Sequence, residues 1–191
     1  MTLTTMLMAG GQSRRMGFDK ATLTIGGEPL WQRQLRVLAE LKPAAVWVSA
    51  RIKPPWCPAE IEVLLDAPPS RGPLSGLAAG LHRLETSHLL VLAIDLPSVS
   101  AEHLRKLCSL IRPGCGVIPT NAGSFEPLSA IYPIESAPTV REALSSSNFS
   151  LQHIAKALVR QNRAEAYVVP AEERAFYLNL NRPSDVESFR A

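Results

Sequence analysis

Residues 6–20 constrain the fold of this chain more than any other stretch. The apolar run from Met6 to Ala9 is typical of a buried strand, and it stops abruptly at Gly10 and Gly11. Glycine N–H groups can approach an anion closely because no Cβ intervenes. Cationic side chains follow soon after the glycines, namely Arg14, Arg15 and Lys20. The stretch therefore predicts a strand that opens into a phosphate-binding loop.

Two well-known phosphate loops are excluded by the spacing of these residues. A P-loop requires a lysine directly after its last glycine, and Phe18 follows Gly17 here. The G-x-G-x-x-G fingerprint of dinucleotide-binding folds is broken by the adjacent pair Gly10 and Gly11. A different nucleotide-binding loop is therefore expected.

Beyond this loop, apolar runs of strand length alternate with stretches of helical spacing. Strands are expected at 44–49, 61–65, 88–94, 116–119, 128–132 and 166–169, and a short hairpin at 21–29. Helices are expected at 30–41, 74–84, 100–111, 139–144 and 151–159, with a short one near Pro183. This alternation predicts an α/β fold of three layers, with a mostly parallel central sheet covered by helices on both faces. We find no repeat or long linker, so residues 1–191 are expected to form a single domain.

Composition narrows the class of protein. With 46% hydrophobic and 19% charged residues over 191 positions, the chain is expected to be globular. A net charge of +3 without a long basic block argues against a nucleic-acid partner. The longest apolar run, from Leu89 to Ile94, is too short to span a membrane. Cys57, Cys108 and Cys115 form no C-x-x-C pair, which favours free thiols and a cytoplasmic location.

Polar features follow several of the expected strands. They are the Gly10–Gly11 loop, Ser49, Asp66 and Asp95. Ligands of open parallel sheets bind beyond the carboxyl ends of the strands, so these features should meet in one cleft. Asp95 follows the most apolar strand, where a buried carboxylate requires a cation or hydrogen-bond donors. A Mg²⁺ ion that also binds phosphate oxygens would satisfy it.

Taken together, the motifs resemble those of the molybdenum cofactor guanylyltransferases, a family of nucleotidyltransferases. In chain order they are Met8-Ala9-Gly10-Gly11, Gly17-Phe18-Asp19-Lys20, Pro29-Leu30-Trp31, Asp66, Gly72-Pro73-Leu74-Ser75-Gly76, Asp95-Leu96-Pro97, Glu126-Pro127-Leu128 and Asn179-Leu180-Asn181-Arg182-Pro183. The resemblance covers nearly the whole chain and implies a Rossmann-like nucleotidyltransferase fold.

The resemblance also implies roles for individual residues. The nucleotide would be bound by Met8, Ala9, Gly10, Gly11, Lys20, Ser49, Asp66, Gly72, Pro73, Leu74 and Asp95. Lys20, Arg15 and Asp95 would act in catalysis, with Asp95 as the Mg²⁺ ligand, and Asn179 and Asn181 would lie towards the pterin. Two positions depart from the family pattern. Ser49 replaces a common asparagine, and residues 147–151 lack an arginine that some members carry.

The activity implied is transfer of GMP from GTP to the phosphate of molybdenum-molybdopterin, with release of pyrophosphate. Transient contact with enzymes that make or accept the molybdenum cofactor is a further expectation. The same chemistry with CTP is the nearest alternative, although Gly10-Gly11 and Gly72-Pro73-Leu74 favour guanine. A sugar phosphate as the acceptor is a further alternative, although enzymes of that kind tend to be longer. A regulator that binds nucleotide without catalysis is disfavoured because Lys20 and Asp95 are both retained.

Overall fold

The computed structural model describes residues 1–10, 19–180 and 185. Its strands are β1 (Leu3–Met8), β2 (Thr24–Ile25), β3 (Glu28–Pro29), β4 (Ala45–Ala50), β5 (Glu62–Leu65), β6 (His88–Ala93), β7 (Gly116–Asn121), β8 (Ser124–Phe125), β9 (Ser129–Pro133) and β10 (Ala164–Val168). Its helices are α1 (Leu30–Ala39), α2 (Pro73–Arg83), α3 (Ala101–Ser109), α4 (Ala137–Ser145) and α5 (Leu151–Arg160). Three 3₁₀ helices are also present among the described residues, η1 (Lys20–Thr22), η2 (Ile134–Ser136) and η3 (Ala171–Tyr177).

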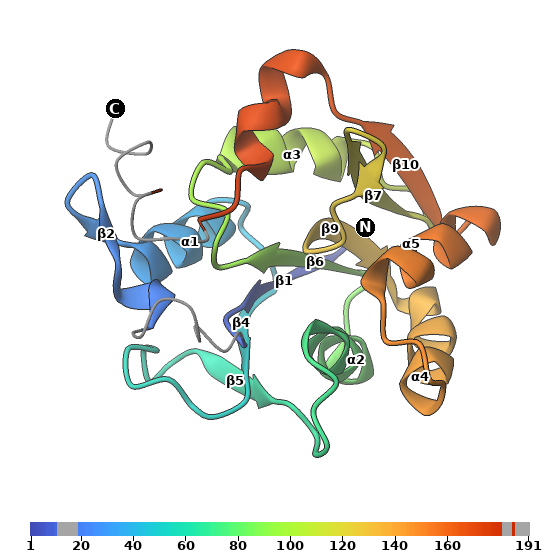
Figure 1. Ribbon diagram of the computed structural model, residues 1–191, viewed down its shortest axis with the longest axis horizontal. Coiled ribbons are helices and arrows are strands. Elements are labelled where there is room, and N and C mark those ends of the chain that lie inside the picture. The colour runs from blue at the N-terminus through green and yellow to red at the C-terminus, as the bar shows by residue number, and fades with distance from the viewer. Residues whose placement is uncertain (11–18, 181–184, 186–191) are drawn as a thin grey trace.

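Within the described residues, eight strands form one mixed sheet (Figure 1). The order across it is β10-β7-β9-β6-β1-β4-β5, with β8 paired to β7. Strand β1 is parallel to β4 and β6, β4 is parallel to β5, and β10 is parallel to β7. Strand β9 is antiparallel to both of its neighbours. The expected mostly parallel sheet is therefore confirmed.

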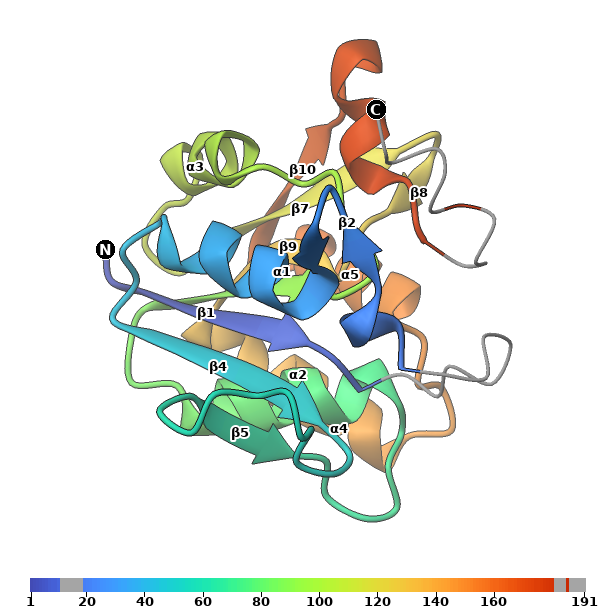
Figure 2. The ribbon, with the colours of Figure 1, turned by 90° about the vertical axis from the view of Figure 1, so that its left-hand side faces the viewer.

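Helices cover both faces of the sheet and give the three expected layers (Figures 1 and 2). On one face, α1 and α3 pack against alternate residues of the central strands such as Leu7, Val48 and Leu90. On the other face, α2, α4 and α5 pack against the intervening residues, for example Met6 and Val91. Every residue of β6 is buried, as expected of a central strand with both faces covered.

The local geometry favours glycine at two places in this fold, a tight turn and a close helix–sheet contact. The β2–β3 hairpin turns through Gly26 and Gly27, whose φ angles of 59° and 83° favour glycine. In α2, a Cβ added at Gly76 would collide with the Ser49 side chain. A Cβ at Gly80 would lie 2.8 Å from Leu89 Cδ2. Helix α2 therefore packs unusually close to the sheet, which holds its N-terminus near the strand ends.

The main differences from the predicted elements lie at their ends and in the C-terminal part. Helix α3 ends at Ser109, two residues earlier than expected, and β10 begins at Ala164, two residues earlier than expected. Helix η3 is not expected from the apolar pattern. The helix predicted near Pro183 lies outside the described residues.

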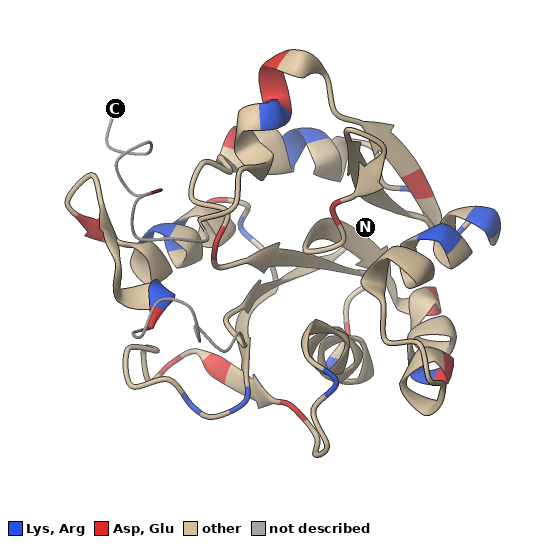
Figure 3. Cartoon of the chain, in the orientation of Figure 1, with Lys and Arg blue, Asp and Glu red and all other residues tan. Residues whose placement is uncertain are grey.

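Basic and acidic residues are interspersed along the described part of the chain (Figure 3). Among the described residues, no helix is both long enough and apolar enough to cross a membrane.

Candidate functional site

The start of the glycine loop is fixed between two neighbouring strands. Met8 lies opposite Ser49 of β4 on one side and Ala93 of β6 on the other. The Ala9 N–H donates a hydrogen bond of 2.9 Å to the Ser49 carbonyl, and the Ile94 N–H donates one of 3.2 Å to the Met8 carbonyl. These hydrogen bonds fix the backbone of Met8 and Ala9 between β4 and the residue that follows β6.

A cavity of about 180 Å³ opens at this edge of the sheet. Its lining comes from the ends of β1 and β6, the turn before η1, the start of α2 and the residue before β9, namely Met8, Ala9, Gly10, Asp19, Lys20, Pro73, Ala93, Ile94, Asp95 and Leu128. Six predicted site residues are thus brought together here: Met8, Ala9, Gly10, Lys20, Pro73 and Asp95.

Lys20 and Asp95 form an ion pair on the wall of this cavity. The distance from Lys20 Nζ to Asp95 Oδ2 is 3.7 Å, and the side chains are 17% and 26% exposed. Lys20 Nζ also donates a hydrogen bond of 2.7 Å to the Leu180 carbonyl. The long ion-pair distance leaves the Asp95 carboxylate electrostatically balanced but able to accept a further ligand.

The surroundings of Asp95 disfavour its charge. Burial raises the pKa of the Asp95 carboxyl above its ordinary value, and the positive charge of Lys20 opposes this shift. A second cation near the carboxylate would stabilise the ionised form further.

Asp19 precedes Lys20, and two hydrogen bonds hold its carboxylate in place. Asp19 Oδ1 accepts a hydrogen bond of 3.0 Å from the Ala21 N–H and so caps η1. Asp19 Oδ2 accepts a hydrogen bond of 2.8 Å from Trp56 Nε1, and the Trp56 ring stacks on Trp31 at 5.7 Å between centroids. Both carboxylate oxygens of Asp19 are therefore engaged, which leaves Asp95 as the carboxylate better placed to take a metal ion.

The loop after β5 carries the next group of predicted residues. Asp66 Oδ2 accepts a hydrogen bond of 2.7 Å from Ser70 Oγ, and Ser70 Oγ also accepts one of 3.2 Å from the Gly72 N–H. Gly72 has a φ of 65°, a conformation that favours glycine, directly before Pro73 opens α2. These hydrogen bonds connect residues within the loop, and the loop leads directly into the first turn of α2.

Two predicted nucleotide contacts have buried side chains. Leu74 is 0% exposed and belongs to the core beneath α2, so only its backbone could face a ligand. Ser49 is 1% exposed and its hydroxyl packs against Gly76. The Ser49 side chain packs on the α2 side of the sheet and is not among the described residues that line the cavity. A side-chain contact from Ser49 to nucleotide is not supported by this position.

The C-terminal segment reaches the site through Leu180. The Leu180 N–H donates a hydrogen bond of 2.8 Å to the Asp95 carbonyl, and its side chain packs with Ile25 and Leu30. Asn179, predicted on the pterin side, is exposed immediately before it. Gly11, Arg15 and Asn181 lie outside the described residues.

A buried polar contact anchors this segment to α3. His103 Nε2 and the Tyr177 hydroxyl are 2.6 Å apart, and His103 Nδ1 is 3.5 Å from Glu173 Oε2. Burial lowers the pKa of the His103 imidazole below its ordinary value, although the Glu173 carboxylate opposes this shift. The neutral ring is favoured, and η3 is held where Leu180 can reach Lys20.

Comparison with known proteins decides the family. Residues 5–166 match the family described as the MobA-like NTP transferase domain. The chain belongs to this family.

Relatives of this MobA-like chain are described as molybdenum cofactor guanylyltransferases. It is 38% identical over 182 residues to the "Probable molybdenum cofactor guanylyltransferase" of Opitutus terrae, covering 94% of this chain and 90% of the relative. It is 28% identical over 193 residues to the "Molybdenum cofactor guanylyltransferase" of Syntrophotalea carbinolica, covering 97% and 89% respectively.

The fold is that of a known nucleotidyltransferase group. The molybdopterin-guanine dinucleotide biosynthesis protein A of Archaeoglobus fulgidus superposes with a TM-score of 0.74 at 22% identity, covering 98% of this chain and 96% of that one. A nucleotidyl transferase of Methanothermobacter superposes with a TM-score of 0.79 at 15% identity, covering 99% and 96%. The predicted Rossmann-like nucleotidyltransferase fold is therefore confirmed.

Some contacts of the MobA-like site are not expected from the sequence. Leu180 contributes through its backbone, which no residue pattern reveals. The sequence predicts only packing for Trp56, and its bond to Asp19 joins residues 37 positions apart. The sequence does place Asp19 directly before Lys20 in the G-x-D-K motif. That adjacency is the signal from which a role of Asp19 near the site could have been inferred.

Proposed function

We propose that this chain transfers GMP from GTP to the phosphate of molybdenum-molybdopterin and releases pyrophosphate. The observation that carries the proposal is the Lys20–Asp95 pair, held at 3.7 Å beside the strand end from Met8 to Gly10. A regulator that only binds nucleotide has no need for a partly buried carboxylate and ammonium next to the phosphate loop. The descriptions of the relatives support guanine and the molybdenum cofactor as the substrate classes.

Gly10 supports the position assigned to the phosphates. A Cβ at Gly10 would meet Ala50 Cα at 3.6 Å, an ordinary contact distance, and the φ of Gly10 is not positive. The packing of the described residues therefore does not require glycine at this position. Close approach of a ligand to the backbone is the remaining reason for it.

The reaction needs positioning and charge neutralisation more than proton transfer. An oxygen of the acceptor phosphate, already ionised at neutral pH, forms a bond to the α-phosphorus of GTP. The bond from that phosphorus to the bridging oxygen of the β-phosphate breaks, and the electron pair leaves with pyrophosphate. Lys20 would stabilise the negative charge that develops on the phosphoryl oxygens, and we assign the same role to Arg15.

Asp95 fits the requirements of a Mg²⁺ ligand. Mg²⁺ is commonly bound by one or two carboxylates together with substrate phosphates and water. Asp95 supplies a partly buried carboxylate at the phosphate end of the cavity, and no cluster of three candidate ligands occurs among the described residues. When bound, the metal would neutralise phosphate charge, while Lys20 holds the carboxylate in place.

The acceptor would approach from the side of the C-terminal segment. Asn179 is exposed next to Leu180, and we assign it and Asn181 to the pterin. Asp66 and the Gly72-Pro73-Leu74 backbone lie along the loop that would contact the nucleoside. We propose a cytoplasmic location, consistent with the free cysteines Cys57, Cys108 and Cys115. Brief contact with cofactor-synthesising and cofactor-accepting enzymes would follow from the fate of the product.

The choice of nucleotide can be tested directly. Purified protein is incubated with molybdenum-molybdopterin, Mg²⁺ and either GTP or CTP, and the product is identified by mass spectrometry. We expect the guanine dinucleotide and pyrophosphate with GTP, and turnover with CTP at least tenfold slower. Equal or faster use of CTP would contradict guanine selectivity, and absence of any dinucleotide would contradict the transferase activity.

The role of Gly10 gives a second test that separates binding from folding. In Gly10→Ala we expect the affinity for GTP to fall about tenfold, or ~1.4 kcal/mol, because the added methyl group displaces the phosphates. The melting temperature should stay within a few degrees of the wild type, since the methyl group meets only ordinary contacts. Calorimetric titration and thermal melting measure the two effects. Unchanged GTP affinity would remove Gly10 from the phosphate site.

A further inference from the structure

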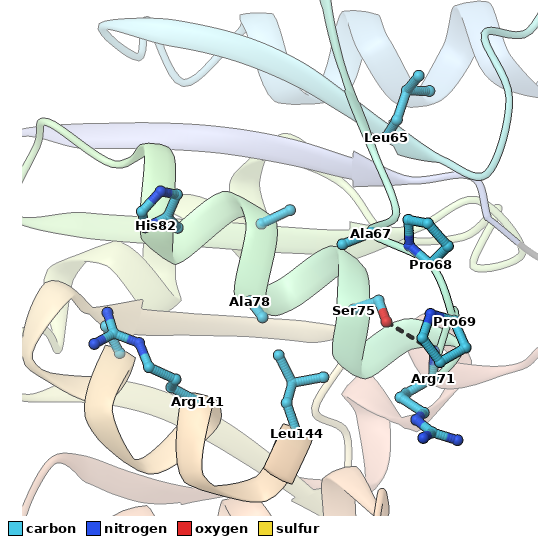
Figure 4. A pocket seen from close by; sticks show the side chains of 12 residues that line it. Leu65, Ala67, Pro68, Pro69, Arg71, Ser75, Ala78, His82, Arg141 and Leu144 are labelled. Carbon is cyan, nitrogen blue, oxygen red and sulfur yellow. Dashed lines mark hydrogen bonds between the residues drawn. The ribbon is translucent and has the colours of Figure 1, made fainter.

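A second and larger cavity lies on the outer side of α2, away from the Lys20–Asp95 pair. Its volume is about 470 Å³, within the range of small-molecule sites. Helix α2 forms its floor, α4 forms one wall, and the loop after β5 forms the other wall (Figure 4). Apolar groups line its centre, among them Ala78, Leu144 and Pro69.

Two of the polar side chains around this cavity are arginines. His82 of α2 and Arg141 of α4 lie across from each other at one end, and Arg71 lies at the other end (Figure 4). None of the described residues that line the cavity is acidic. Neither arginine forms an ion pair with a carboxylate among the described residues. Arg71 instead packs over the Phe149 ring, 4.4 Å from its centroid.

This combination selects one kind of ligand. A flat apolar body would cover the small side chains of the floor, and a carboxylate or sulfonate would meet the guanidinium of Arg141. A neutral molecule of the same size would leave that charge unpaired, and a cation would be repelled. We propose that the cavity is an effector site for a small organic anion with an apolar ring system.

The wall of the cavity connects this effector site to the loop after β5. The Arg71 N–H donates a hydrogen bond of 2.8 Å to Ser75 Oγ, which itself lines the cavity. One residue earlier, Ser70 Oγ holds Asp66 Oδ2 at 2.7 Å. A ligand seated against Pro69 and Arg71 would therefore restrict the loop from Asp66 to Gly72. Any consequence for nucleotide affinity rests on the proposed function, because that loop is assigned to the nucleoside.

The test uses 2-naphthoate as the anionic ligand and 2-naphthalenemethanol as its neutral counterpart. Calorimetric titration of the full chain should show binding of 2-naphthoate at least tenfold tighter than binding of the alcohol. Hydrogen exchange should slow in the peptide that covers residues 66–72 when 2-naphthoate is added. Neither readout depends on GTP or on catalysis, so the outcome is independent of the proposed transferase activity.

Matched variants locate the binding. Arg141→Gln removes an exposed charge and should weaken 2-naphthoate binding at least tenfold, whereas Arg160→Gln, an exposed charge at the end of α5, should leave it unchanged. Ala78→Leu should abolish binding by filling the cavity floor. The proposal is overturned if 2-naphthoate does not bind at millimolar concentration, if the alcohol binds equally well, or if Arg141→Gln has no effect. Unchanged exchange over 66–72 would overturn the effect on the loop.

Discussion

Replacing Lys20 by alanine is expected to lower turnover by ~10²–10³, the usual loss when one group that stabilises transition-state charge is removed. The ammonium lies 3.7 Å from Asp95 and 2.7 Å from the Leu180 carbonyl, and these contacts hold it at the cavity beside Met8, Ala9 and Gly10. Steady-state kinetics at saturating GTP would measure the loss. Lys53→Ala, which removes an exposed cation from the loop after β4, should retain full activity as the matched control.

The same substitution also affects folding, and the two effects can be separated. Without Lys20, the Leu180 carbonyl loses a donor and Asp95 loses its counter-charge, which we expect to cost about 1–3 kcal/mol of unfolding free energy. Adding Asp95→Asn to Lys20→Ala removes the unpaired charge and should recover part of that stability without recovering activity. Near-normal turnover in the single variant would show that Lys20 serves only to neutralise Asp95.

Much of the fold was predictable because burial on both faces leaves a strong signal. The apolar run from Leu89 to Ile94 could hardly be anything but a central strand, and leucines at helical spacing marked α2. The direction of β9 was not predictable, because it depends on a pairing between Leu90 and Ile131, far apart in the sequence. Helix η3 carries no apolar periodicity and is held in place by the tertiary contact between His103 and Tyr177.

The candidate site was predictable where a side chain follows directly on a strand. Asp95 comes just after β6, and Met8 ends β1, so the topology alone brings them to one edge. The apolar run 44–49 places Ser49 at the end of its strand, whereas β4 continues to Ala50 and the Ser49 hydroxyl packs against Gly76 of α2. The contact from Leu180 to Lys20 could not be inferred from the residues, since it joins a backbone carbonyl to a side chain 160 positions away.

Replacing Asp95 by asparagine should cause the second large loss, and it tests the metal-binding role directly. Asparagine keeps the size of the side chain but removes the negative charge that Mg²⁺ requires. We expect the Mg²⁺ concentration for half-maximal rate to rise more than tenfold and the maximal rate to fall by ~10²-fold. Activity measured across a Mg²⁺ titration gives both values, and Glu60→Gln, an exposed carboxylate after β4, is the matched control.

Stability should change little in Asp95→Asn, although activity falls. Because burial raises the pKa of Asp95 in the folded protein, the unfolded chain ionises at lower pH. The free energy of unfolding therefore falls as the pH rises from ~3.9, the pKa of Asp95 in the unfolded chain, through its higher pKa in the folded protein. Asparagine avoids this penalty, so the variant should melt within a few degrees of the wild type at pH 7, even though Lys20 loses its partner. Unchanged Mg²⁺ dependence together with an unchanged maximal rate would show that Asp95 only ends the strand, and the proposed metal site would then have to be abandoned.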